Sequence, residues 1–249
     1  MYKNIISSFK AYGSSFRIIN LLGLWKYFGI PILISILTAA LIIFLSWGLS
    51  DNLGAFISKI WVWEWGAETF RSISTIIGAM TIIAIGLIVY KHIVLALSAP
   101  FMGLVSEKIE AYLVGTDPDQ YSKFNWKLLW RGIRINMRNL SLEILFSILI
   151  LIIGLIPIIG IISTILLFLV QSYYAGFGNM DYTLERHLTY KQSIAFVRNH
   201  KGIAIGNGMI FMSMLLIPII GIILVLPLSV TAASTETINV VLKSKSKKE

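Results

Sequence analysis

The residues of this chain that could do chemistry are mainly cationic, and four of them share one side of a predicted helix. Spacings of four, three and four residues place these cations in one stripe: Lys127, Arg131, Arg134 and Arg138. An apolar face adjoins the stripe, which is typical of a basic amphipathic helix at a membrane surface. The stripe either contacts lipid headgroups, which the sequence alone favours, or concentrates anions at the mouth of a pore.

Two acidic residues lie upstream of this stripe on another predicted helix. Glu107 and Glu110 are three residues apart and therefore share a face. This face could pair with Arg131, Arg186 or Arg198 and dock a hairpin or a second subunit. Alternatively it is solvated, in which case an exposed ion pair contributes only about 0–1 kcal/mol.

The sequence offers little of what enzymes and metal sites depend on. It contains no cysteine, which excludes disulfides, thiolate nucleophiles and cysteine metal sites. His92, His187 and His200 show no ligand spacing, so we expect solvated or interfacial roles for them. No glycine-rich phosphate loop, serine-hydrolase motif or zinc-protease motif occurs. We therefore expect a chain that is not an enzyme and that needs no cofactor and no metal.

Composition places these residues in a membrane protein. Hydrophobic residues make up 57% of the chain and charged residues 13%, far from the balance of soluble proteins. Two uncharged stretches, 28–50 and 72–90, are long enough to span a bilayer, because about 20 helical residues suffice. The net charge is +9, and the basic residues flank apolar stretches without forming a domain of their own. This pattern indicates a membrane surface as the partner and no nucleic acid.

One eight-residue string, LIPIIGII, occurs twice, at 155–162 and 216–223. The apolar arm before each proline would extend only about 20–24 Å, against a hydrocarbon core of about 30 Å. Proline interrupts a helix, and the glycine three residues later can adopt a positive φ. We therefore expect two helical hairpins, 144–180 and 202–235, that enter the membrane part-way and return. The alternative for each is a single tilted, proline-kinked helix.

The two ends of the chain are basic. Residues 1–22 predict an amphipathic helix lying on the membrane, with Ile5, Phe9, Tyr12, Phe16 and Ile19 opposite Lys3, Lys10 and Arg17. The positive-inside rule places the N-terminus in the cytoplasm, because the loop after the first span is net acidic. Residues 243–249 form a lysine-rich tail that we expect to be disordered. The whole chain, 1–249, is thus predicted to be one all-α integral membrane domain.

Several strings resemble the CysZ sulfate-permease family, which is related to the etoposide-induced protein 2.4 family. They are LGLWK at 22–26 with Pro31, APF at 99–101 with EKIE at 107–110, DY at 181–182 with Glu185 and Arg186, and IP at 217–218 through Pro227 to AAST at 232–235. The resemblance implies two full spans and two partly inserted hairpins. It also implies a homo-oligomer in the inner (plasma) membrane that takes up sulfate for cysteine biosynthesis.

The resemblance further implies an anion site just before the first span. The family holds sulfate with backbone N–H groups at a helix start and with an arginine after Gly-Leu. The corresponding residues here are Leu22, Gly23, Leu24 and Lys26, but Trp25 stands where the arginine is expected. Lys26 could supply charge without the bidentate geometry of a guanidinium. Alternatively, Gly23 only separates the surface helix from the first span.

Two functions of different classes fit these features. The first is a CysZ-like channel or permease for a small oxyanion, above all sulfate. The second is a membrane interaction or lipid-handling protein whose basic helices bind headgroups. The apolar stretches 28–50, 72–90, 144–180 and 202–235 contain no ionisable residue. That absence argues against a proton-coupled pump, but it allows a passive pore lined by Ser, Thr, Asn and helix ends.

Overall fold

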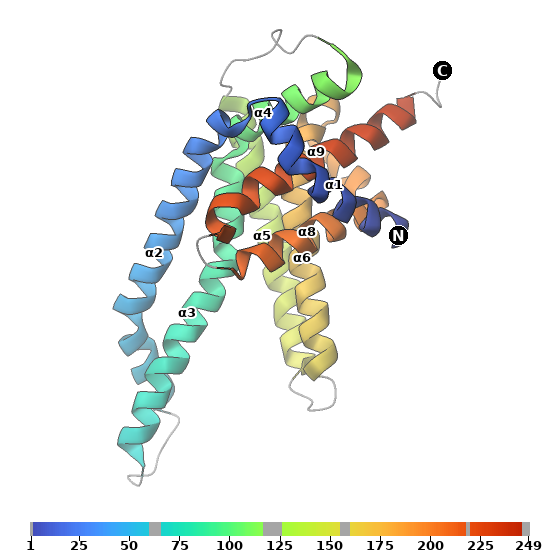
Figure 1. The fold of residues 1–249 in the computed structure, drawn as a ribbon. Coiled ribbons are helices and arrows are strands. Elements are labelled where there is room, and N and C mark those ends of the chain that lie inside the picture. Colours follow the sequence, from blue (N-terminus) through green and yellow to red (C-terminus); the bar gives the residue numbers. More distant parts are fainter. Residues whose placement is uncertain (1, 60–65, 117–125, 155–159, 218–219, 246–249) are drawn as a thin grey trace.

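A computed structural model describes residues 2–59, 66–116, 126–154, 160–217 and 220–245 of the protein. These ranges fold into nine helices joined by turns, and they contain no strand (Figure 1). The helices are α1 (Tyr2–Leu21), α2 (Trp25–Ser58), α3 (Ala67–Leu97), α4 (Ala99–Val114), α5 (Trp126–Gly154), α6 (Gly160–His187), α7 (Tyr190–Asn199), α8 (Lys201–Leu215) and α9 (Ile220–Lys245). The prediction of an all-α protein is confirmed.

Two pairs of long helices extend from one end of the molecule, where α1, α4, α8 and α9 lie (Figure 1). The α2–α3 pair contains both predicted spans, 28–50 and 72–90. Four described helices are long and apolar enough to cross a membrane, namely α2, α5, α6 and the part of α9 from Ile223 to Leu242. A fifth is added if Ile88–Leu97 and Ala99–Val114, which meet at 67°, count as one broken span. The chain is therefore a multi-pass membrane protein.

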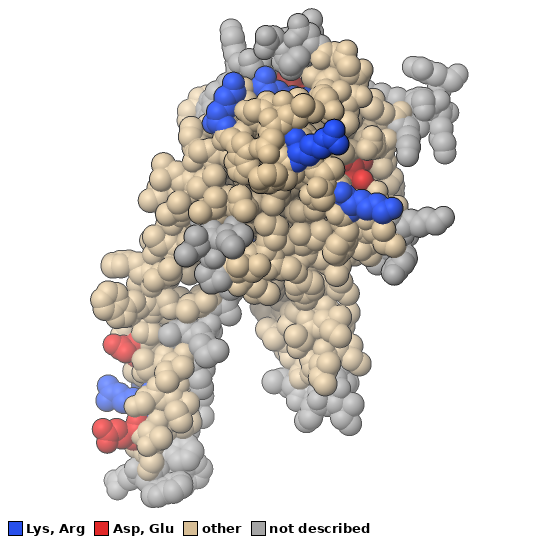
Figure 2. Space-filling view, viewed as in Figure 1, with Lys and Arg blue, Asp and Glu red and all other residues tan. Residues whose placement is uncertain are grey.

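Charged side chains occupy two levels of the molecule. On the face shown in Figure 2 they gather at the end that holds α1 and α4, and again along the outer part of the α2–α3 pair. On α3 the uncharged stretch 72–90 separates Arg71 from Lys91. As a helix this stretch is about 28 Å long, which matches a hydrocarbon core of about 30 Å.

The two helix pairs differ in reach. Nζ of Lys91 on α3 lies 2.6 Å from Oε1 of Glu143 on α5, so these residues mark a common level. Beyond that level α3 continues to Ala67, a helical length of about 36 Å, whereas α5 continues only to Gly154, about 16 Å. The α5–α6 pair consequently ends well short of the α2–α3 pair (Figure 1).

The helices of the predicted hairpins are longer than the apolar stretches that indicated them. α5, from Trp126 to Gly154, joins the predicted basic helix and the first apolar arm into one helix, and α6 continues to His187 instead of ending at 180. α9 continues to Lys245, so the first residues of the predicted disordered tail are helical. The apolar pattern set these boundaries too narrowly, because each helix continues into its charged part.

The glycines that follow the two prolines do not have the positive φ that the sequence analysis allowed for. Pro157 and Pro218 lie outside the described residues, but Gly160 and Gly221 are helical and neither has a positive φ. A Cβ on Gly221 would lie only 2.3 Å from the carbonyl oxygen of Met214 on α8. Gly221 therefore serves close approach of the two helices and not a left-handed turn.

Glycines also let α8 pack between α6 and α1. A Cβ on Gly208 would lie 1.7 Å from the carbonyl oxygen of Ser172, and one on Gly176 would lie 1.9 Å from that of Ala204. On another side of α8, a Cβ on Gly206 would lie 2.9 Å from Cα of Ile5 in α1. Helix backbones approach this closely only where no side chain intervenes.

The face that the N-terminal helix buries against the protein overlaps only in part with the predicted apolar face. The buried face of α1 consists of Ser8, Ala11, Ser15 and Ile19. Of the predicted apolar face, Ile19 is buried, Ile5 and Tyr12 are half-buried, and Phe9 and Phe16 are exposed. α1 thus packs on the protein through small residues, while its exposed aromatic rings suit contact with a bilayer.

Candidate functional site

The turn between α1 and α2 contains the predicted anion-site residues. Gly23 adopts φ +59°, and a Cβ there would meet no atom within 4 Å. Glycine is therefore needed for the left-handed backbone and not for space. Leu24 is fully buried and anchors the turn in the core.

Three backbone N–H groups of this turn close the end of α1. Leu22 donates to the carbonyl of Ile18 (3.0 Å), Gly23 to that of Asn20 (3.2 Å) and Leu24 to that of Ile19 (2.9 Å). In α2, the N–H of Tyr27 donates to the carbonyl of Leu24 (2.9 Å). The N–H groups that a helix start leaves without an intrahelical partner are here those of Trp25 and Lys26.

Two lysines from different helices lie near the ring of Tyr27, at the start of α2. Nζ of Lys26 lies 5.3 Å from the ring centroid of Tyr27, and Nζ of Lys108, on α4, lies 5.7 Å from the same centroid. The partial positive charge of the helix start adds to these two ammonium groups. Sequence reasoning missed Lys108, whose only signal was its place between Glu107 and Glu110.

Trp25 is packed and hydrogen-bonded. Its Nε1 donates to Oδ1 of Asn20 (2.7 Å), and its ring meets Phe16 and Phe28 edge-on, at centroid distances of 5.8 and 6.2 Å. Trp25 thus joins the end of α1 to the start of α2 and supplies no charge.

The basic stripe on α5 faces α6 and α7. Arg131 donates to Oδ1 of Asp181 (3.0 Å), to the carbonyl of Leu188 (2.9 Å) and to Oγ of Ser193 (2.8 Å). The guanidinium of Arg134 lies 4.3 Å from the ring centroid of Tyr190. The contacts of Arg131 with Asp181, Leu188 and Ser193 thus hold α5 against α6 and α7.

The remaining stripe residues differ in their surroundings. Arg138 lies 5.7 Å from the ring centroid of Phe177 and donates to Oδ1 of Asn139 (3.0 Å). Lys127, near the start of α5, is exposed. Of the four stripe residues, Lys127 and Arg134 are the exposed ones.

Of the acidic pair on α4, Glu110 meets the end of α6, where its partner is Arg186, one of the three arginines considered from the sequence. Nη2 of Arg186 lies 2.8 Å from Oε2 of Glu110, and Nε2 of His187 lies 2.8 Å from Oε1 of the same residue. Arg186 also donates to the carbonyl of Gly103 (3.1 Å) and to Oγ of Ser106 (3.0 Å). These contacts tie the α5–α6 pair to α4.

The two glutamates of α4 have different surroundings. Burial raises the pKa of Glu110, but its contacts with His187 and Arg186 outweigh burial and lower that pKa to about 2. Burial also raises the pKa of Glu107, and this effect exceeds the opposing charges of Arg186 and Lys108. Among the described residues, Oε1 of Glu107 has no hydrogen-bond partner.

A buried ionic cluster joins the two helix pairs. Glu143 accepts from Nζ of Lys91 through Oε1 (2.6 Å), and its Oε2 lies 2.9 Å from Nε2 of His92. Lys91 and Glu143 are fully buried, and His92 is 3% exposed. Lys91 also donates to the carbonyl of Gln171 on α6 (3.3 Å). Removing one partner would leave an uncompensated buried charge, so the cluster holds α3, α5 and α6 in register.

Sequence reasoning missed this cluster. The expectation of a solvated or interfacial His92 was wrong, because Glu143 and Asn136 hold both ring nitrogens in the interior. The sequence feature that could have indicated the cluster is a charged residue at the end of each of two apolar stretches. Lys91 follows 72–90 directly, and Glu143 directly precedes 144–180.

Comparison with known proteins places this architecture in a family. Residues 11–226 match the family described as Sulfate transporter CysZ/Etoposide-induced protein 2.4. The chain belongs to this family. The CysZ/etoposide-induced protein 2.4 match includes the α1–α2 turn, the buried cluster and the contact between α4 and α6.

Relatives in the CysZ/etoposide-induced protein 2.4 family carry the name Sulfate transporter CysZ. One from Pseudomonas fluorescens strain Pf-5 is 29% identical over 143 residues, which cover 55% of this chain and 56% of the relative. Another, from P. fluorescens strain Pf0-1, is 26% identical over 175 residues, or 67% and 69% of the two chains. A third, from P. aeruginosa strain LESB58, is 27% identical over 143 residues, or 55% and 57%. The chain thus matches about half the length of the first and third of these relatives.

Proposed function

We propose that this protein is a channel or permease that carries a small oxyanion, above all sulfate, across the inner (plasma) membrane for cysteine biosynthesis. The observation that carries the proposal is the match of residues 11–226 to a family whose relatives are named Sulfate transporter CysZ. The apolar helices of the chain support a place in the membrane.

The anion site in this proposal is the start of α2. The N–H groups of Trp25 and Lys26 would donate to the anion, and the ammonium groups of Lys26 and Lys108 would balance its charge. Leu22, Gly23 and Leu24 shape the turn, because their own N–H groups close α1. Because no arginine is present in this site, no guanidinium group can donate two parallel hydrogen bonds to the anion. The site would therefore select its ligand mainly by negative charge.

The other predicted site residues have separate roles in this proposal. Lys127 and Arg134 are exposed on α5 and would attract anions toward the protein. Arg131 and Arg138 serve mainly to fix α5 against α6 and α7. Glu110 and Arg186 dock the α5–α6 pair onto α4.

We further propose that both hairpins insert only part-way and that the N-terminus is cytoplasmic. The short reach of α5 beyond Glu143 supports the first hairpin, and α8, a helix of 15 residues and about 22 Å, supports the second. The basic residues at the end that holds α1 support the orientation. The two full spans of one chain, in α2 and α3, would leave an anion pathway exposed to lipid. Further copies of the chain in a homo-oligomer would enclose that pathway.

Growth of a bacterial strain that lacks its own sulfate uptake tests the proposal. Expression of this chain should restore growth on sulfate as the sole sulfur source, and growth on cysteine should be equal with and without the chain. The Lys26→Gln, Lys108→Gln double variant should restore growth less. Failure to grow on sulfate, with the protein present in the membrane fraction, would contradict the proposal and favour the lipid-handling alternative.

A further inference from the structure

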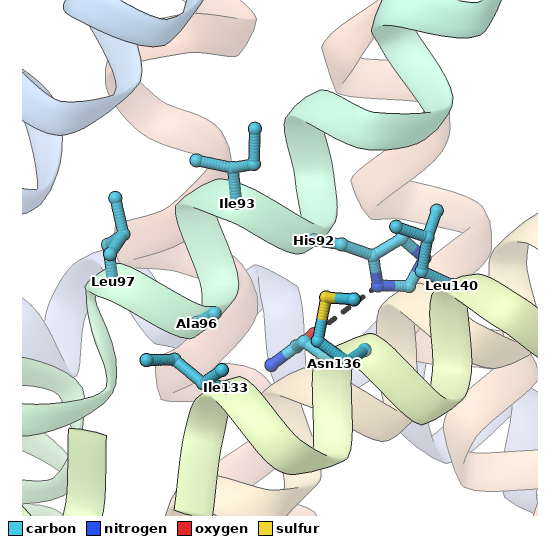
Figure 3. A pocket seen from close by; sticks show the side chains of 8 residues that line it. His92, Ile93, Ala96, Leu97, Ile133, Asn136 and Leu140 are labelled. Atoms are coloured by element: carbon cyan, nitrogen blue, oxygen red, sulfur yellow. Dashed lines mark hydrogen bonds between the residues drawn. The ribbon is translucent and has the colours of Figure 1, made fainter. Parts of the chain in front are cut away.

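A pocket opens between the last turns of α3 and the middle of α5 (Figure 3). Its volume is about 200 Å³, less than the roughly 300–1,000 Å³ that hold a whole small molecule. Two of its lining residues are polar and buried, His92 and Asn136, and their side chains interact with one another (Figure 3). The other lining residues are apolar: Ile93, Ala96, Leu97, Ile133, Met137 and Leu140. The size and the lining suit a segment of a hydrocarbon chain.

The pocket lies along an exposed apolar stripe on α5 and shares Met137 with it. The exposed members of the stripe recur at helical spacing: Trp126, Trp130, Met137, Ile144, Ile148 and Leu151. Trp126 and Trp130 are each more than 70% exposed. Exposed tryptophans are typical of the headgroup level of a membrane, and the apolar arm beyond Glu143 is typical of its interior. The pocket therefore opens where one lipid chain would pass from interface to interior.

A cation lies beside this stripe. Arg134 directly follows the lining residue Ile133 and is exposed, although its guanidinium also stacks on Tyr190. A basic residue at headgroup level attracts an anionic lipid. The charge and the apolar stripe together fit a molecule with an anionic head and an aliphatic chain.

We propose that the α3–α5 pocket binds one acyl chain of an anionic phospholipid, whose headgroup lies near Arg134. This site is separate from the start of α2 and does not depend on sulfate transport. The bound chain covers the apolar opening in front of His92, and so it shields the buried ionic cluster from water.

Photochemical labelling tests the proposal with the full-length protein. The probe is phosphatidylglycerol with a photoreactive acyl chain, doped into phosphatidylcholine vesicles that hold the protein. Peptide mapping should find adducts concentrated on 93–97 and 133–140, relative to the exposed face of α2. Leu97→Trp should fill the pocket and lower these adducts about ten-fold, the effect of about two buried methylene groups. The matched control is Leu41→Trp on exposed α2, which should leave them unchanged.

Two further measurements test whether the bound lipid has an anionic headgroup and whether a lipid or a second copy of the chain covers the pocket. Arg134→Gln should lower the preference for phosphatidylglycerol over an equally photoreactive phosphatidylcholine about five-fold. Equal labelling by both lipids in the wild type, or adducts spread evenly over all exposed apolar faces, would overturn the proposal. Efficient linkage of Met137→Cys into covalent dimers by a short bis-maleimide would overturn it too, because a second copy would then cover the pocket. If Leu97→Trp lowers the melting temperature, its loss of adducts could reflect misfolding. The distribution of adducts on the wild-type protein then decides whether the pocket binds an acyl chain.

Discussion

Trp25 occupies the position at which the resemblance implies an anchoring arginine, and Asn20 and two aromatic rings hold its indole there. Two ammonium groups, those of Lys26 and Lys108, lie close by, at the ring of Tyr27. The residues around the start of α2 thus provide charge from two helices but no bidentate donor.

Substitutions at the start of α2 should change sulfate affinity in opposite directions. Trp25→Arg adds a charged donor, and a hydrogen bond to a charged group contributes about 1.5–3 kcal/mol, so sulfate should bind roughly ten-fold tighter or more. Lys26→Gln and Lys108→Gln should each weaken binding. Titration calorimetry on the purified proteins measures these changes. Unchanged affinity in Lys108→Gln would place the site away from α4.

Glu110 and Glu107 form a matched pair for testing electrostatics at the α4–α6 contact. Glu110→Gln should lower the melting temperature near neutral pH, because the carboxylate is stabilised by Arg186 and His187. The folded-state pKa of Glu110 is lowered from 4.5 to about 2, so this stabilisation is present above pH 4.5 and is lost as pH falls toward 2. The difference between wild type and variant should shrink over that window.

Glu107→Gln is the control for this effect. Oε1 of Glu107 has no hydrogen-bond partner among the described residues, and burial outweighs the charges of Arg186 and Lys108, so this substitution should not lower the melting temperature. Equal losses from the two substitutions would show that the ion pair with Arg186 does not matter.

The sequence offered one of these residue contacts as one of several possibilities and missed another for a clear reason. Glu110 shares a helix face with Glu107, so an arginine partner could be sought, and Arg186 is that partner. Lys91 and Glu143 are 52 positions apart, and only the packing of α3 against α5 makes them neighbours. Local spacing carries no information on which ends of two apolar stretches will meet.

At the scale of helices, hydrophobic periodicity identified the elements better than the faces they bury. The pattern in 1–22 predicted α1 and the buried Ile19, but α1 also packs through Ser8, Ala11 and Ser15, which the pattern did not indicate. Small residues give almost no signal in a hydrophobic pattern, although they permit the closest helix contacts. The same holds for α8, whose glycines define its packing.

A glycine substitution in α8 should reveal how tightly the helices pack. Gly208→Ala places a methyl group against the carbonyl of Ser172, so α8 must shift, and we expect a loss of about 1–3 kcal/mol. Gly29→Ala in α2 is the control, because a Cβ there meets no atom within 4 Å. It should be neutral or stabilise by up to about 1 kcal/mol. Thermal unfolding of both variants in the same detergent measures this difference. Equal melting temperatures would contradict the close approach of Gly208 to Ser172.

Thiol labelling tests how deeply the hairpins insert. The chain has no native cysteine, so single cysteines can replace the exposed Ile161, near the start of α6, and Leu216, after α8. With partial insertion, both should resist an impermeant thiol reagent added from the side that faces the α2–α3 connection. Lys59→Cys near that connection should react from the same side as a positive control. Rapid labelling of Ile161→Cys or Leu216→Cys from there would mean full crossings.

At the scale of the whole molecule, two charged levels and an uncharged band of about one bilayer thickness set the position in the membrane. Composition alone predicted the membrane class, because 57% of the residues are hydrophobic. The lengths of the apolar stretches predicted two spans and two shorter hairpin arms, but not the level at which α3 and α5 meet, which is set by the contact of Lys91 with Glu143. Measured from the contact of Lys91 with Glu143, the α5–α6 pair is about 20 Å shorter than the α2–α3 pair.

Uptake of radiolabelled sulfate into liposomes tests the transport proposal most directly. Liposomes that contain the wild-type chain should accumulate sulfate faster than empty liposomes. Excess unlabelled sulfate should compete with the label, and chloride should compete less. The Lys26→Gln, Lys108→Gln double variant, reconstituted in equal amount, should be slower than wild type. Uptake by the wild type no faster than by empty liposomes, with the protein folded and inserted, would contradict the account.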